Sequence, residues 1–129
     1  IYEEQDHLKA ASEQCLNIWD GIKSELNAWD DVTQTATKHY IGFKKNNTLI
    51  AAVRFFKNHL SLDISRGNIS TEGKKSQNFF TADDPKNMLK EQNWTYKNGV
   101  VGNAYILKIT SLDQLEYAKF LIKQKYDSL

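Results

Sequence analysis

Cysteine, proline and methionine each occur only once in this chain of 129 residues, as Cys15, Pro85 and Met88. A single cysteine cannot form the disulfide framework on which small secreted domains rely, so a reducing, cytoplasmic compartment is predicted. No stretch approaches the about 20 apolar residues that a membrane-spanning helix needs, and no apolar signal-peptide core is found at the N-terminus. The sequence therefore predicts a protein without a membrane partner.

The residue patterns of most catalytic sites are also missing. No glycine-rich phosphate loop follows a strand-like segment, and no serine stands in the strand–turn–helix elbow of a nucleophile. His7, His39 and His59 are isolated in the sequence. His39 and His59 could approach each other, but solvent-exposed or sheet-pairing roles are more typical of such histidines than a metal site. We therefore predict no enzymatic activity, no cofactor and no metal site.

A metal-dependent nuclease would need two or three carboxylates and a lysine that converge on strand ends. Asp63 is the only acid between residues 39 and 64, and Glu72 and Lys74 lie in a polar segment that does not resemble a strand. Catalytic nuclease activity is therefore not expected.

The composition that is present suits a folded domain. Hydrophobic residues make up 40% and charged residues 26% of the chain, whose length fits one domain over residues 1–129. The chain begins with Ile1 and its only methionine is internal, which predicts a piece of a larger protein. The rest of that polypeptide is then an expected partner.

Charge is segregated along the chain, although the formal net charge is only +1. Residues 1–37 hold eight acids against two bases, whereas residues 38–75 hold eight bases against two acids. Such segregation can mark an interaction surface. It is explained equally well by an acidic helix that lies near a basic sheet.

The first segment has the apolar period of a helix. The apolar stripe consists of Leu8, Ala11, Cys15, Ile18, Trp19, Ile22, Leu26 and Trp29. This spacing predicts one long helix from about Glu3 to Trp29, in which Cys15 is a small core residue. The polar run from Asp30 to Thr37 is predicted to form a connection.

From His39 to Ile64 the apolar period changes to two. Residues 41–43, 49–56 and 60–64 alternate in the manner of strands, and Asn46-Asn47 and Asn58 stand at the breaks. Asparagine tolerates positive φ and is common in tight turns. The pattern predicts a meander of three antiparallel strands.

The segment after the meander is polar. Residues 66–83 read as a long loop that Phe79 and Phe80 attach to the body of the domain. Asp84, as a capping residue, and Pro85, at a first helical position, predict a short helix with Met88 and Leu89 on its buried side.

The C-terminal part contains two specific local signals. Asn98-Gly99 predicts a hairpin, followed by a strand at about Ala104–Thr110. Ser111 and Gln114 have capping-box spacing and predict a final helix. Its apolar stripe is predicted to consist of Leu112, Leu115, Ala118, Leu121, Ile122 and Tyr126.

The predicted fold class is α+β. An antiparallel sheet, formed by the three-strand meander and one or two C-terminal strands, is packed by a long N-terminal helix and a C-terminal helix.

The meander combines basic and aromatic side chains. Cations neutralise phosphates and aromatic rings stack on unpaired bases, so this pattern suits DNA or RNA. The candidate contact residues are Tyr40, Lys44, Lys45, Arg54 and Lys57. A solvated sheet face is the alternative. Trp94 and Tyr96 form a second candidate contact, for which core packing is the alternative.

Three stretches also resemble a known family: TKHYIGFKKNNTLIAAV, DDPKNM and ILKITSLDQLEYAKFLIKQKYDSL. Residues 40–44, Asp84-Pro85, residues 115–117 and residues 121–126 match motifs of the bacterial domain of unknown function 5655. The chain departs from that pattern at NWTYKNGVVGNA, which replaces a glycine-rich turn, and at residues 66–80, which look like an insertion.

The resemblance implies a C-terminal domain of bacterial proteins whose other part resembles a restriction-type nuclease or another defence module. Some relatives carry the label "predicted transport protein". The family has no established catalytic residues, so the resemblance assigns none to this chain.

Two functions remain open. One is a non-catalytic accessory or binding domain that contacts nucleic acid through a basic sheet face. The other is a structural protein–protein interaction or dimerisation domain, with a possible homodimer and no role in nucleic-acid binding.

Overall fold

A six-stranded antiparallel sheet organises the chain in the computed structural model, which describes residues 1–129. The strands are β1 (Val32–Ala36), β2 (Ile41–Lys45), β3 (Thr48–Phe55), β4 (Leu60–Ile69), β5 (Lys90–Thr95) and β6 (Val101–Ile109). Their order in the sheet is β1-β2-β3-β4-β6-β5, so β1 and β5 are the edges. The α+β prediction is confirmed.

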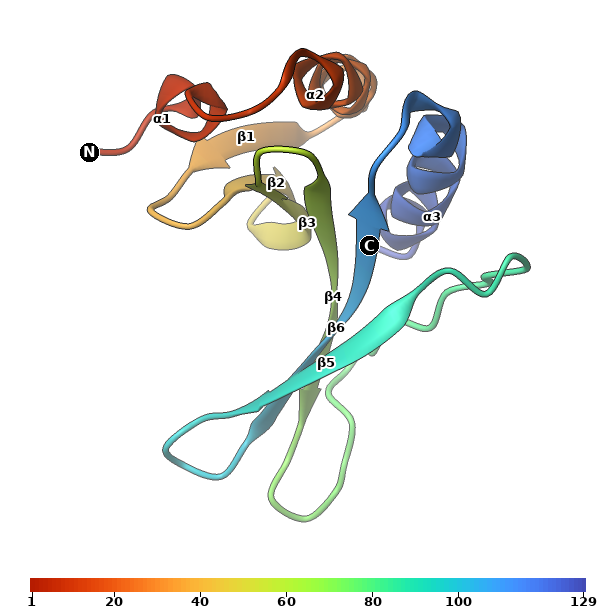
Figure 1. Cartoon of the computed structure of the whole chain (residues 1–129). Helices are drawn as coiled ribbons and strands as arrows, with labels where there is room; N and C mark the ends of the chain where they lie inside the picture. Colours follow the sequence, from red (N-terminus) through yellow and green to blue (C-terminus); the bar gives the residue numbers. More distant parts are fainter.

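The helices are α1 (Glu4–Leu8), α2 (Glu13–Asn27) and α3 (Leu115–Asp127), the last preceded by the 3₁₀ turn η1 (Leu112–Gln114). Figure 1 shows the helices gathered at one end of the sheet, with parts of β4, β5 and β6 extending beyond them. A core of 21 buried residues joins α2 and α3 to β2, β3, β4 and β6.

The first helix differs from its prediction because it is broken in two. Ser12 has an extended backbone (φ −68°, ψ 164°), and its hydroxyl accepts a hydrogen bond from the Cys15 N–H at 3.3 Å. Its own N–H donates to the Lys57 carbonyl in the β3–β4 turn at 2.9 Å. Ser12 therefore caps α2, while the buried stripe that begins at Cys15 is confirmed.

Residues 32–36 form the edge strand β1, where the prediction of a connection was wrong. The side chains that point toward the helices include Gln34, which donates to Glu4 Oε1 at 2.6 Å and accepts from Asn27 Nδ2 at 2.9 Å. Val32 and Ala36 also point inward and pack against the core, but the inward position between them makes polar contacts. For this reason the strand lacks the apolar alternation by which strands are recognised.

The three-strand meander is confirmed as β2, β3 and β4. Asn46 adopts φ 56° in the β2–β3 turn, as its tolerance of positive φ predicts. The pairing of β2 with β3 shifts between Phe43 and Lys44, and this bulge allows both Ile50 and Ala51 to be buried.

No helix forms after Asp84. Its carboxylate instead caps an irregular turn by accepting hydrogen bonds from the N–H groups of Met88 (3.2 Å) and Leu89 (2.9 Å). Because β5 begins at Lys90, too few residues remain to continue a helix beyond its costly first turn. The predicted burial of Phe80 is confirmed.

The hairpin at Asn98-Gly99 is confirmed and joins β5 to β6, with Gly99 at φ 87°. The Ser111–Gln114 capping box is also present. Leu112 is 52% exposed, contrary to the predicted stripe, because it lies in the 3₁₀ turn and not in α3.

A candidate binding cleft on the open face of the sheet

The strand register divides the side chains of the sheet between two faces. Residues such as Phe43, Leu62 and Leu107 belong to the core shared with the helices. The opposite side, which the helices leave uncovered, is called the open face here. It includes Gly42, Lys44, Leu49, Ala52, Arg54, Ser61, Asp63, Ser65, Lys90, Gln92, Trp94, Gly102, Ala104, Ile106 and Lys108.

A cleft of about 550 Å³ lies on this face. Three aromatic residues, Tyr40, Trp94 and Tyr96, contribute to its lining. The floor of the cleft between these rings is formed by small side chains, among them Ala52 and Ala104, which leave space above the sheet. The cleft therefore has room for a flat group beside aromatic rings.

Glycines bring two of the aromatic rings close to the backbone. A Cβ atom at Gly42 would lie 3.0 Å from the Tyr40 ring, and one at Gly102 would overlap the indole of Trp94. Because the indole covers Gly102 directly, a side chain there would displace it. The two glycines allow these rings to lie against the sheet.

Arg54 and Asp63 provide the charged pair of the cleft. Arg54 Nη2 lies 3.3 Å from Asp63 Oδ2, and the Asp63 side chain is 14% exposed. Burial raises the pKa of the Asp63 carboxyl, although the Arg54 charge and a hydrogen bond from Ser61 act in the opposite direction. Asp63 can accept hydrogen bonds there, while Arg54 is half exposed and can reach a ligand.

The other charges of the open face are all positive. Lys44, Lys90 and Lys108 make no ion pair, whereas the only acid on this face, Asp63, is paired with Arg54. The open face is therefore suited to an anionic ligand.

A second hollow of about 650 Å³ adjoins the cleft, and the two share Tyr40 and Arg54. Lys9 and Lys38 line it, with Lys9 paired to Asp6 at 3.8 Å, and Phe56 adds an exposed ring. The cleft and this hollow form a continuous surface that combines cations with aromatic rings.

The structure distributes the five residues of the predicted nucleic-acid site over different places. Tyr40 and Arg54 line the cleft, and Lys44 lies on the same face outside it. Lys45 lies on the opposite face, where its Nζ reaches the carbonyl oxygens of Tyr126 (3.2 Å) and Leu129 (2.9 Å). Lys45 stands two residues after the buried Phe43, so strand alternation places both side chains on the side of the helices.

Lys57, the fifth predicted residue, lies in the β3–β4 turn and does not line the cleft. Trp94 and Tyr96 are 40% and 47% exposed, so the alternative of core packing was wrong for both. They come from a hairpin far along the chain from Tyr40, yet all three rings line one cleft.

Sequence reasoning missed Asp63 and Gln92 as cleft residues. A signal was present for Asp63, because β4 alternates core leucine and isoleucine with small or polar residues. Gln92 lies in β5, whose six residues are all exposed and show no such alternation. The β4 pattern identifies an uncovered face but does not say which strand lies beside it. In the sheet, β4 lies between β3 and β6. The sequence pattern does not show that β6 is the second neighbour of β4.

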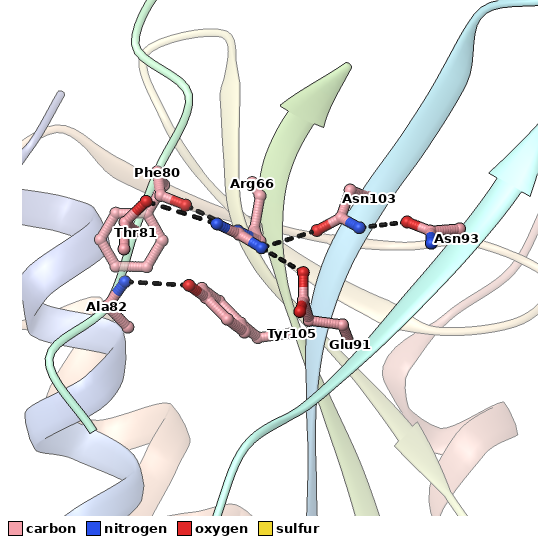
Figure 2. A network of polar contacts seen from close by, with 8 residues as sticks. All are labelled: Arg66, Phe80, Thr81, Ala82, Glu91, Asn93, Asn103 and Tyr105. Atoms are coloured by element: carbon pink, nitrogen blue, oxygen red, sulfur yellow. Dashed lines mark hydrogen bonds and ion pairs between the residues drawn. The ribbon is translucent and has the colours of Figure 1, made fainter. Parts of the chain in front are cut away.

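Arg66 is the centre of a separate polar network, shown in Figure 2. It lies at a bulge in β4 and donates to the Phe80 carbonyl (2.8 Å), Asn103 Oδ1 (3.2 Å) and Glu91. A further hydrogen bond reaches the Thr81 hydroxyl at 3.3 Å. These contacts attach the segment after the long loop to β5 and β6, so the network holds the fold together.

No group of three or more histidine, cysteine or acidic side chains is placed to hold a metal ion. His59 stacks on Phe56 with ring centroids 4.5 Å apart, and His39 lines the second hollow. None of the helices has the length and apolar character needed to cross a bilayer.

The fold and the cleft define a class of protein, an α+β domain whose antiparallel sheet is covered by helices on one side and open on the other. Residues 4–128 match the model of the family described as "Domain of unknown function (DUF5655)". The chain belongs to this family, which confirms the resemblance. Comparisons with curated proteins and with solved structures found no match.

Proposed function

We propose that this chain is a non-catalytic binding domain that holds single-stranded nucleic acid on the open face of its sheet. The observation that carries the proposal is the cleft itself. Tyr40, Trp94 and Tyr96 line it together with Arg54, and every other charged side chain on the open face except Asp63 is a lysine.

Each part of the cleft has a role in this proposal. Aromatic rings stack on bases whose faces are free, which favours a single strand over a duplex. Lys44, Lys90 and Lys108 neutralise backbone phosphates around the cleft. Gln92 and Asp63 present hydrogen-bonding groups to the edges of a base.

The electrostatic part is tested by replacing Lys44 and Lys108 with glutamine. Binding of a fluorescent single-stranded DNA or RNA is measured by anisotropy at several salt concentrations. The slope of log affinity against log salt should decrease by about 0.7 for each phosphate contact removed. The matched control replaces Lys86 and Lys123, which lie away from the open face, and should leave the slope unchanged.

The stacking part is tested with Trp94→Leu. Removing one stacked base contact should weaken binding by about 1–3 kcal/mol. Phe120→Leu is the control, because Phe120 is an exposed ring on α3. The proposal is wrong if the wild-type domain does not bind single strands at low salt, or if binding is indifferent to salt.

The β5 edge favours a second candidate function, docking of a protein chain or of a second copy. All six residues of β5 are exposed, and one side of its backbone has no strand partner. Exposed strand edges pair readily with other strands. Sedimentation should then show a mass that rises with concentration. A monomer that also fails to bind the remainder of its parent polypeptide would contradict this function.

The proposed setting is the one that the family resemblance implies. The domain would act in the bacterial cytoplasm as part of a larger, restriction- or defence-linked polypeptide, and bring that polypeptide to nucleic acid.

A further inference from the structure

Lys125 is a largely buried lysine whose ammonium group has no hydrogen-bond or ion-pair partner in the chain. It lies on α3, is 4% exposed, and its Nζ takes part in no hydrogen bond or ion pair. The described contact of the ammonium group is with the Phe80 ring, whose centroid is 5.5 Å away. Every fully buried side-chain nitrogen of the chain has a hydrogen-bond partner, so the unpaired Nζ keeps contact with solvent and is accessible to an anion.

Lys125 lines a pocket of about 260 Å³. The pocket exists because β3 pairs with β4 only as far as the Ala51–Ile64 pair. Beyond the bulge, the returning loop takes the place of β3: Ser76 N–H donates to the Asn68 carbonyl (2.8 Å) and Phe80 N–H to the Arg66 carbonyl (2.9 Å). The pocket lies where β3 ends and this loop begins.

The lining of the pocket is polar and contains no acid. Its hydroxyl and amide groups come from Thr48, Ser65, Gln77 and Asn78. These side chains can donate hydrogen bonds to an oxyanion. The lining groups supply donors, but no negative charge for Lys125.

Arg66 also lines the pocket and adds a second positive charge. Glu91 pairs with Arg66, but no acid pairs with Lys125. Lys45 lies close by, because it contacts the carbonyl oxygen of Leu129, another lining residue. The pocket is therefore surrounded by more positive than negative charge.

We propose that this pocket binds a small oxyanion of the phosphate or sulfate class, with the ammonium group of Lys125 as its ion-pair partner. The hydroxyl groups of Thr48 and Ser65 and the amides of Gln77 and Asn78 donate hydrogen bonds to the remaining oxygens. Burial lowers the pKa of Lys125, and a bound anion would oppose that shift.

This inference does not depend on nucleic-acid binding. The pocket shares Leu49, Ser65 and Gly67 with the open-face cleft, so its anion is either a free phosphate or a phosphate of a strand held in the cleft. The chemistry of recognition is the same in both cases.

The test uses inorganic phosphate and the whole chain. Thermal unfolding is followed at constant ionic strength while chloride is replaced by phosphate. The wild-type protein should show a saturable rise in Tm, because a ligand that binds only the folded state stabilises it. Lys125→Met should reduce phosphate affinity by about tenfold to a hundredfold, the effect of losing one charge-assisted hydrogen bond.

Lys123→Met is the matched control, because Lys123 is an exposed lysine on the same helix. It should keep the full phosphate response. The proposal is wrong if the wild-type Tm does not respond to phosphate, or if the response survives in Lys125→Met.

A second measurement keeps the site testable if Lys125→Met does not fold. Phosphate is titrated into isotope-labelled wild-type protein, and the amide signals of Ser65, Gly67 and Asn78 should shift together. Absence of these shifts overturns the proposal. Where the shifts occur, competition by a single-stranded oligonucleotide identifies a strand phosphate as the source, and simultaneous binding identifies a free oxyanion.

Discussion

Asp84 connects the segment before β5 to helix α3. Its carboxylate accepts hydrogen bonds from the Tyr117 hydroxyl and from the N–H groups of Met88 and Leu89. The Tyr117 hydroxyl in turn accepts from the Lys86 N–H at 3.1 Å. One short side chain thus fixes a turn in which no helix forms.

Replacing Asp84 with alanine should lower the free energy of unfolding by about 2 kcal/mol, because partly buried donors lose their acceptor. Urea denaturation measures this loss. Asp83→Ala is the matched control: Asp83 uses only its backbone, in hydrogen bonds with Gln124, and its replacement should change stability by less than about 0.5 kcal/mol. Equal losses in both variants would contradict the assigned role.

Asp63 and Asp84 should affect the pH dependence of stability in opposite directions. Burial raises the pKa of Asp63 in the folded state. Its ionisation therefore destabilises the fold, and stability is lost as pH rises from the ordinary aspartate pKa through the raised value. In Asp63→Asn this loss should disappear, so the variant gains stability relative to wild type over that window.

For Asp84, burial alone would raise the pKa, but hydrogen bonds from Tyr117, Leu89 and Met88 outweigh it and lower the pKa. Its stabilising contribution is complete above the ordinary aspartate pKa and is lost as pH falls through the lowered value. Asp84→Asn should therefore lose stability relative to wild type as pH rises. Urea titrations across the acidic range compare the two variants, and slopes of the same sign would contradict one of the two assignments.

At the scale of elements, the long loop before β5 is attached to the sheet through Arg66. Its guanidinium group lies 4.3 Å from the Tyr105 ring centroid and 4.7 Å from that of Phe79, in addition to its hydrogen bonds. Lysine cannot reproduce this planar, multiply bonded arrangement.

Arg66→Met should reduce the free energy of unfolding by about 3 kcal/mol, because it leaves buried acceptors unpaired. Relative to wild type, the rate of hydrogen exchange in Arg66→Met should increase more in residues 70–82 than in α2. Lys74→Met is the control within the same loop, since only the backbone of Lys74 is hydrogen-bonded. Unchanged exchange in Arg66→Met would show that the loop is held by other contacts.

The elements also show where sequence patterns are sufficient. The meander, the Asn98-Gly99 hairpin and the final capping box were predicted because each depends on residues close in sequence. The break at Ser12 and the edge strand β1 were missed. The break at Ser12 depends on a distant partner, the Lys57 carbonyl. The strand β1 pairs with the next strand in the chain, but its polar inward residue Gln34 hides the apolar alternation.

At the scale of the whole molecule, one apolar cluster joins α2 and α3 to four strands. A single shared core predicts one cooperative unfolding transition. Far-UV circular dichroism and tryptophan fluorescence, recorded in Trp94→Leu so that Trp19 and Trp29 at the core are the reporters, should give the same urea midpoint, with a slope of about 1–3 kcal/mol per molar urea. Separate midpoints would show that the extended part of β4, β5 and β6 unfolds independently.

The candidate site shows the same division between local and distant information. Tyr40, Arg54, Trp94 and Tyr96 were recognised from the sequence as two separate groups of possible contacts. Only the order β3-β4-β6-β5 places them around one cleft. Lys45 lies on the other face because it alternates with Lys44 and follows the core residues Ile41 and Phe43 in β2.

The sequence by itself determined the fold class, the meander, the buried stripe of α2 and the kinds of side chain available for binding. These features follow from hydrophobic period and turn chemistry, which act between near neighbours in the chain. Tertiary structure alone decided the open face, the cleft and the unpaired Lys125 beneath it. These depend on which strands pair and where their register shifts, and such contacts join residues that are far apart in the sequence.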